Sequence, residues 1–237
     1  MRYDRPASNV PQSTVALLAT ALCLVAVAST AFAECSDRPG PGVEWVNCSK
    51  ERLMLGGEDL SGANLENAML SGTGFAGATL VEANLQRSEL VRTSFKGADL
   101  SRANMEKALA SRANFDGAIL RNTRLVKAEF LRVSFAGADL SGADLSSGDF
   151  YRNDFTNATL AGADLHDAIM PRTIFTGADL TGVRLDGAFL LGSRFEGVDM
   201  SGVVGLEQAQ LDQTCGDAAT VLPAGLVAPD RWPCAAD

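Results

Sequence analysis

Histidine is almost absent from this sequence, and most aromatic types are scarce. Its 237 residues include one histidine, His166, with two tryptophans and two tyrosines. A lone histidine is more often a surface residue than a catalytic base. Serine and aspartate are plentiful, but they recur at regular intervals and no combination stands out as a catalytic triad. The sequence therefore predicts no enzyme, no catalytic residue and no cofactor.

Positive charge is also in short supply. The chain has 20 lysines and arginines against 29 aspartates and glutamates, which gives a formal net charge of −9. An acidic surface repels nucleic acids and anionic membranes. We therefore expect a protein partner or self-association, and no nucleic acid partner.

One hydrophobic run stands apart near the N-terminus. Arg2 and Arg5 precede the apolar residues 15–28, and the small residues Ala31 and Ala33 fit a cleavage site before Glu34. This order is typical of a secretory signal peptide. The alternative, a membrane anchor, is disfavoured because the run is short for a membrane span. We expect residues 1–33 to be removed, leaving no stable membrane span and a periplasmic or secreted protein.

Cysteine is missing from the whole middle of the chain. If Cys23 leaves with the signal peptide, four cysteines remain, in one close pair near each end. An even number in an exported protein suggests disulfides, so we expect Cys35–Cys48 and Cys215–Cys234. A zinc site is the alternative. It is disfavoured because no histidine lies near either pair and the spacings match no common zinc finger.

A five-residue repeat fills the chain between the cysteine pairs. Every fifth residue from Leu60 to Met200 is large and apolar, except Ala110; we call these residues centres. A small residue usually lies two positions before a centre, and glycine often lies two positions after it. A period of five fits neither a helix nor a strand. It predicts a short extended segment with centre and small residue facing inward, followed by a corner where glycine supplies a positive φ.

The centres also repeat every twenty residues. One set of centres is entirely phenylalanine: Phe75, Phe95, Phe115, Phe135, Phe155, Phe175 and Phe195. Residues twenty apart therefore behave as stacked neighbours, so that four pentapeptides make one coil with four faces. Stacked rings at a strand spacing of about 4.8 Å stabilise such a column. Ala110 is the one gap, and it marks a weak coil unless Phe130, one coil later, fills the space.

The repeats "GANLENAML" (residues 62–70), "GADLSGADL" (137–145) and "GADLTGVRL" (177–185) resemble the pentapeptide repeat family, with its consensus A-(D/N)-L-x-x. The resemblance implies an all-β fold, a right-handed quadrilateral parallel β-helix or solenoid. We assign the β-helix to residues 58–204, an N-terminal cap to 34–57 and a C-terminal cap to 205–237, with a short helix at 206–213. The family shares a shape and no single activity.

One corner column differs from the rest. Arginine takes the place of glycine every twenty residues, at Arg92, Arg112, Arg132, Arg152 and Arg172, and apolar residues that include Leu131, Tyr151 and Leu191 adjoin it. Like charges one strand spacing apart repel each other, which disfavours a purely structural role. The alternative is neutralisation by acids three residues earlier, such as Glu89, Glu129 and Asp149. We predict that this edge binds a protein or anionic partner.

Two other polar columns are structural candidates. Asn64, Asn84 and Asn104 are twenty residues apart and predict an amide ladder. Five aspartates share another face, which raises the possibility of calcium: Asp59, Asp99, Asp139, Asp179 and Asp199. Thr79, Ile119 and Thr159 interrupt that set, so we expect no metal.

Three functions remain open at this point. The first is a non-enzymatic, exported interaction or scaffold protein of the bacterial envelope. The second follows from the family, because some cytosolic members resemble DNA in shape and charge and bind DNA gyrase; the signal peptide and the paired cysteines argue against it. The third, an enzyme acting on polysaccharide, needs clustered acid and base groups that the sequence does not bring together.

Overall fold

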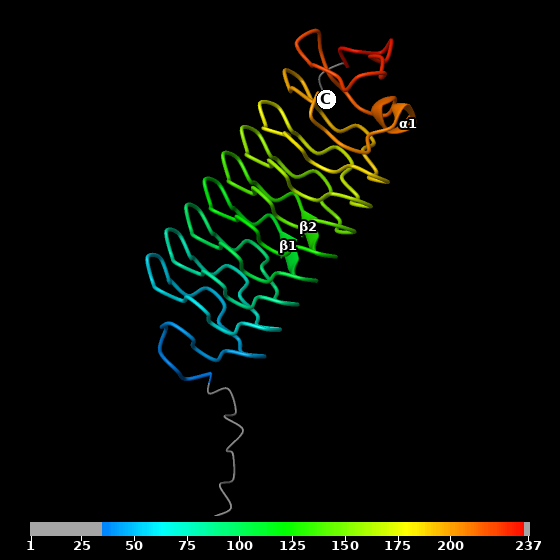
Figure 1. Ribbon diagram of the computed structural model, residues 1–237. Coiled ribbons are helices and arrows are strands. Elements are labelled where there is room, and N and C mark those ends of the chain that lie inside the picture. Colours follow the sequence, from blue (N-terminus) through cyan, green and yellow to red (C-terminus); the bar gives the residue numbers. More distant parts are fainter. Residues whose placement is uncertain (1–34, 235–237) are drawn as a thin grey trace, which may run out of the picture. The chain divides into compact units, whose positions relative to one another are not determined.

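The computed structural model describes residues 35–234, which wind into a stack of coils (Figure 1). The predicted signal peptide, residues 1–33, lies outside the described residues. Parallel β-bridges join residues twenty apart along the stack, from Glu44–Asn64 to Arg184–Val204. These bridges confirm the twenty-residue period and the four-pentapeptide coil.

Each pentapeptide consists of a short extended segment and a tight turn. The N–H of Leu60 donates to the carbonyl of Thr79 on the next coil at 2.7 Å, and the N–H of Ala63 donates back to Leu60 at 3.0 Å to close the turn. The third residue of the turn takes a positive φ, for example 64° at Gly62. Gly202 does not take a positive φ. The register shifts at this point, and the N–H of Gly182 donates to the carbonyl of Gly202.

The core is a narrow column of centres and small residues, nearly all of them fully buried. The column of phenylalanine centres from Phe75 to Phe195 stacks as expected: its rings twenty residues apart have centroids 4.7–5.4 Å apart and tilt by at most 19°. Each stacked pair adds about 0.5–1.5 kcal/mol beyond the burial of its surface. Neighbouring coils themselves are one strand spacing apart, about 4.7–4.9 Å, because parallel β-bridges join them.

Two neighbouring coils form the regular strands β1 (Leu109–Ser111) and β2 (Glu129–Leu131), which pair in parallel side by side (Figure 1). Ala110 lies directly opposite Phe130 in this pair. The ring of Phe130 is 5.8 Å from that of Phe115 and 6.1 Å from that of Phe135. Phe135 is the centre that follows Phe130 along the chain, whereas Phe115 lies fifteen residues earlier. The Phe130 ring is nevertheless closer to Phe115, so it leans back toward the coil of Ala110.

The N-terminal end of the stack is closed by Trp45 and Lys50. Coil pairing begins at Glu44, inside the segment that we assigned as a cap, although that segment lacks the repeat motif. Trp45 is fully buried at a centre position. The Lys50 ammonium lies 4.0 Å from the centroid of the Trp45 ring and donates to the carbonyl of Cys35 at 2.5 Å. Together these groups cover the first coil.

The C-terminal end is closed by a short helix and the chain that follows it. Helix α1 spans Gln208–Leu211 and is shorter than the predicted 206–213, because a capping box between Glu207 and Gln210 starts it late (Figure 1). The Gln210 amide donates to the carbonyls of Leu185 and Ala188, both at 2.8 Å, which satisfies open groups of the last coils. In residues 35–234, no helix has the length and apolar character needed to cross a membrane.

Candidate functional site

The five arginines of the predicted edge occupy the same corner of successive coils, and we call them the arginine column. Their φ angles lie between 55° and 56°, the conformation that glycine takes at other corners. All five residues are exposed. Their backbone N–H groups are already used, as in the bond from Arg112 to the carbonyl of Leu131 at 3.0 Å. The column therefore offers its guanidinium groups, and not its backbone, to a ligand.

None of these five arginines forms an ion pair within residues 35–234. The acids three residues earlier form no direct ion pair with these arginines within the described residues. Glu89 instead accepts a hydrogen bond from the Ser71 hydroxyl at 3.0 Å, and Asp149 accepts one from the Tyr151 N–H at 3.2 Å.

Corner side chains meet the corners of neighbouring coils, which explains the missing pairs. At another corner column, Arg102 pairs with Glu82, twenty residues earlier, at 2.9 Å. Within the arginine column the neighbouring corner holds another arginine or a glycine, so no acid is placed where the guanidinium reaches. Among residues 35–234 the column is therefore a row of positive charges without direct ion pairs, on an acidic protein.

A groove of about 370 Å³ runs beside the column. It is lined by Val91, Arg92, Ser111, Arg112, Leu131, Arg132 and Tyr151. The structure thus brings together five of the eight residues predicted for partner binding. Arg152 contacts the groove through Tyr151, its guanidinium carbon 5.3 Å from the centroid of the ring. Arg172 and Leu191 lie further along the stack and do not line it.

Apolar side chains extend the surface on one flank of the column. Leu131 and Leu191 follow their centres and are 39% and 48% exposed. Four more side chains just before the centres of this face are 42–45% exposed: Met69, Leu109, Ile169 and Phe189. Glu89, Glu129 and Asp149 stand in the same row, so the accessible border of the arginine column is apolar at four of seven positions and acidic at three.

One member of this edge, Arg52, was not predicted from the sequence. It occupies the same corner two coils before Arg92, with a φ of 57°, and Gly72 stands between them. A smaller hollow of about 140 Å³ lies between Arg52 and Arg92. Counting back from Arg92 in steps of twenty would have found Arg52, but the neighbouring centre, Lys50, is not apolar and hid the repeat.

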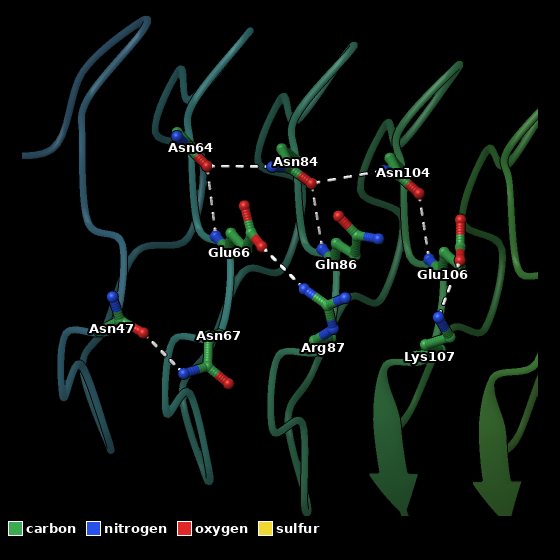
Figure 2. A network of polar contacts seen from close by, with 10 residues as sticks. All are labelled: Asn47, Asn64, Glu66, Asn67, Asn84, Gln86, Arg87, Asn104, Glu106 and Lys107. Carbon is green, nitrogen blue, oxygen red and sulfur yellow. Dashed lines mark hydrogen bonds and ion pairs between the residues drawn. The ribbon is translucent and has the colours of Figure 1, made fainter.

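The asparagine ladder is confirmed, and each of its side chains makes internal hydrogen bonds (Figure 2). The side-chain amide of Asn84 donates to Asn64 at 3.1 Å, and that of Asn104 donates to Asn84 at 3.5 Å. The side-chain oxygens of these asparagines also accept backbone N–H bonds from residues such as Glu66 and Glu106. The ladder holds coils together and leaves little capacity for a ligand.

The aspartates considered for calcium are engaged in their own turns. Asp59 accepts bonds from both the hydroxyl and the backbone N–H of Ser61, which lowers the pKa of its carboxyl below the usual value. No group of three or more histidine, cysteine or acidic side chains in the described part of the chain is arranged to hold a metal ion. His166 contacts the Asp164 carboxylate at 3.0 Å, and that carboxylate also binds Arg184.

The four cysteines predicted to pair lie within bonding distance as Cys35–Cys48 and Cys215–Cys234. Their Cα atoms are 5.4 and 5.5 Å apart. Each pair links two segments of the chain at one end of the stack. Trp232, beside the second pair, donates its indole N–H to the carbonyl of Thr214 at 2.8 Å.

Comparison with known proteins identifies the repeat. A family model described as pentapeptide repeats matches in eight copies over residues 59–97, 88–126, 109–150, 134–172 and 173–204. The matched model does not describe an enzyme family. No curated protein matches the chain.

Several solved structures are similar to the chain. HetL, a pentapeptide repeat protein involved in heterocyst differentiation regulation in Nostoc sp. strain PCC 7120, is 23% identical; the match covers 84% of this chain and 90% of HetL, with a TM-score of 0.30. A trypsin-treated form of QnrB1, a plasmid-mediated fluoroquinolone resistance protein, is 22% identical over 78% and 92% of the two chains, with a TM-score of 0.49.

A pentapeptide repeat protein from the Arabidopsis thaliana thylakoid lumen is 27% identical over 55% of this chain and 82% of its own, with a TM-score of 0.34. Identities and TM-scores at this level transfer no activity and no partner to this chain.

Proposed function

Because this chain belongs to the pentapeptide repeat family, we propose that it is a non-enzymatic interaction or scaffold protein that binds an anionic or protein partner along the arginine column. In this proposal the coils form a right-handed, four-sided β-helix. The observation that carries the proposal is the row of five arginines without ion pairs, beside a groove with apolar walls, on a chain of net charge −9.

The energetics of the column favour a partner. Neighbouring coils are joined by parallel β-bridges and lie one strand spacing apart, about 4.8 Å, so the corners bring like charges close together. A non-glycine residue in the left-handed conformation also costs about 1–2 kcal/mol. Glycine would remove both the left-handed cost and the repulsion, although corners of other columns, such as Arg102 and Lys107, also hold non-glycine residues with a positive φ. Arginine is suited to carboxylate or phosphate groups, which it binds with two parallel hydrogen bonds.

We also propose that the protein acts in the bacterial envelope or outside the cell. The support is the signal-peptide pattern of residues 1–33 together with the two cysteine pairs. Disulfides persist in oxidising compartments such as the periplasm. A fractionation of cells that detects the protein in the cytosol alone would contradict this part of the proposal.

Site-specific photo-crosslinking in cells tests the binding edge. A photoreactive amino acid replaces Tyr151 in one variant and Thr181, the matched position after a centre on another face, in a second. We expect a crosslinked partner from position 151 and none from position 181. The double substitution Arg112→Gly/Arg132→Gly, which keeps a residue suited to the positive φ, should abolish the product. Crosslinking that survives this substitution would overturn the proposal.

The acidic net charge supports a second candidate, a DNA-like surface that binds DNA gyrase or another topoisomerase. A supercoiling assay with the chain lacking residues 1–33 separates the two candidates. Inhibition or protection of the enzyme that survives Arg112→Gly/Arg132→Gly would favour the second. An unchanged supercoiling rate would remove it.

A further inference from the structure

We propose that the arginine column receives an α-helix of a partner protein, and that this helix carries one acidic residue per turn beside an apolar stripe. The inference rests on the proposed function and specifies the partner's chemistry. It follows from the spacing of the column, from the polarity of its two flanks and from the length of its uninterrupted run.

The spacing of the corners matches the pitch of an α-helix. Parallel β-bridges join neighbouring coils, so the corners repeat at one strand spacing, about 4.7–4.9 Å. An α-helix advances about 5.4 Å per turn, so acidic residues at i, i+4, i+7 and i+11 form a row with nearly this spacing. The mismatch is about 0.6 Å per step and about 2.4 Å over four steps, which flexible arginine side chains absorb.

An extended peptide fits the column less well. Residues on one face of a strand are about 6.6–6.8 Å apart, so their carboxylates fall out of step with the arginines by roughly a whole coil after three steps. The open edges of the coils are at the two ends of the stack, which are capped. Addition of a strand is therefore not available along this face.

The two flanks of the column differ in polarity. On the side of the groove, the residues just before the arginines include Val91, Leu131 and Tyr151. On the other side, the corresponding outward residues include Asn114 and Ser134, which bond to Asp116. A helix with an acidic row and an apolar stripe on one side of it satisfies both flanks. A linear polyanion would bind the arginines and leave the apolar wall exposed to water.

The length of the run sets the length of the helix. The column continues without interruption from Arg92 to Arg172, and glycines at positions 72 and 192 end it. Four coil steps correspond to about 20 Å, or about 13 helical residues. Helix α1 of this chain has only four residues, Gln208–Leu211, and none of them is acidic. A second copy therefore does not supply such a helix from its described residues.

Peptide binding tests this inference directly. The first probe is a labelled peptide of about 14 residues with glutamate at i, i+4, i+7 and i+11 and leucine one position after each glutamate. The second has the same composition with the glutamates at every second residue, and the third is inorganic polyphosphate. Affinities are measured by fluorescence anisotropy at low and physiological salt, because surface charge interactions are strongly screened.

We expect the helical peptide to bind at least about tenfold more tightly than the alternating peptide, and Arg112→Gly/Arg132→Gly to weaken it by about tenfold or more. Leu131→Ser should weaken the helical peptide but not polyphosphate. The matched control is Arg102→Gly, a corner arginine of another column, which should change the affinity by less than about twofold. Circular dichroism of each variant establishes that the coils are intact.

Three results would overturn the inference. Equal affinity for both peptides and polyphosphate would make the column a general polyanion site. Undiminished binding by the Arg112→Gly/Arg132→Gly variant would place the peptide elsewhere. Absence of peptide binding, together with an arginine-dependent crosslink at position 151, would refute the helix and leave the proposed interaction function standing.

Discussion

At the residue scale, a single glycine decides how one core ring is placed. Gly148 occupies the inward position two residues before the centre Phe150, where most coils have alanine. A Cβ at this position would lie 2.6 Å from Cε2 of Phe150 and 3.0 Å from the carbonyl of Ala128. The Phe150 ring therefore folds back over its own glycine. At the equivalent place one coil earlier, Ala128 blocks this arrangement, and Phe130 leans toward Phe115 instead.

Gly148→Ala is therefore expected to destabilise the protein although alanine suits this backbone. Overpacking of a filled core costs about 1–3 kcal/mol. The control is the same change in a Phe150→Leu background, where the smaller side chain makes room and the added cost should shrink or vanish. Urea unfolding followed by circular dichroism measures both. Equal losses in the two backgrounds would show that Phe150 is not what the new methyl group meets.

At the element scale, the repeating unit is the coil, and the core of each coil packs against the cores of the neighbouring coils. Ala110 leaves space in its coil, and the ring of Phe130 leans back toward it, 5.8 Å from Phe115. Ala110 is itself only 3% exposed. The space in the coil of Ala110, which the sequence marked as a weak point, is thus filled by a residue from the next coil along the chain.

This packing predicts compensation between the two positions. Ala110→Leu alone should destabilise the stack by about 1–3 kcal/mol, because the space it needs is occupied. Phe130→Leu alone should also destabilise it by leaving a cavity. The double variant restores a leucine at each centre, so its loss should be clearly smaller than the sum of the single losses. Additive losses in thermal or urea unfolding would contradict the coupling.

The repeating parts of this fold were predictable from sequence, and the irregular parts were not. The period of five determines which residues face inward, and the period of twenty determines which residues stack. Both periods hold in every coil of the repeat. Arg52 and the pairing of Glu44 with Asn64 were missed because Lys50 and the residues around it lack the motif. The partners of the corner arginines were not predicted either. A corner side chain contacts the corner of the neighbouring coil, twenty residues away, and not the acid three residues earlier in the sequence.

At the scale of the whole molecule, stability depends on the two ends, because each coil is supported only by its neighbours. A cysteine pair lies at each end, with sequence separations of 13 and 19 residues. Closing a loop of about 15 residues with a disulfide stabilises a protein by about 3 kcal/mol in the chain-entropy model. The covalent closures therefore lie where the stack is most prone to fray.

An intact mass of the protein from a periplasmic fraction, with and without reductant, tests export and both closures together. We expect a chain that begins at Glu34 and gains four hydrogens on reduction, two for each pair. Cys35→Ser/Cys48→Ser should then lower stability by about 3 kcal/mol and fray the first coil, so that the emission of buried Trp45 shifts to longer wavelength at lower denaturant. The matched pair Cys215→Ser/Cys234→Ser should leave Trp45 unaffected until the stack itself unfolds. A full-length chain with free thiols in the cytosol would refute export, and it would make binding to a topoisomerase the function to test next.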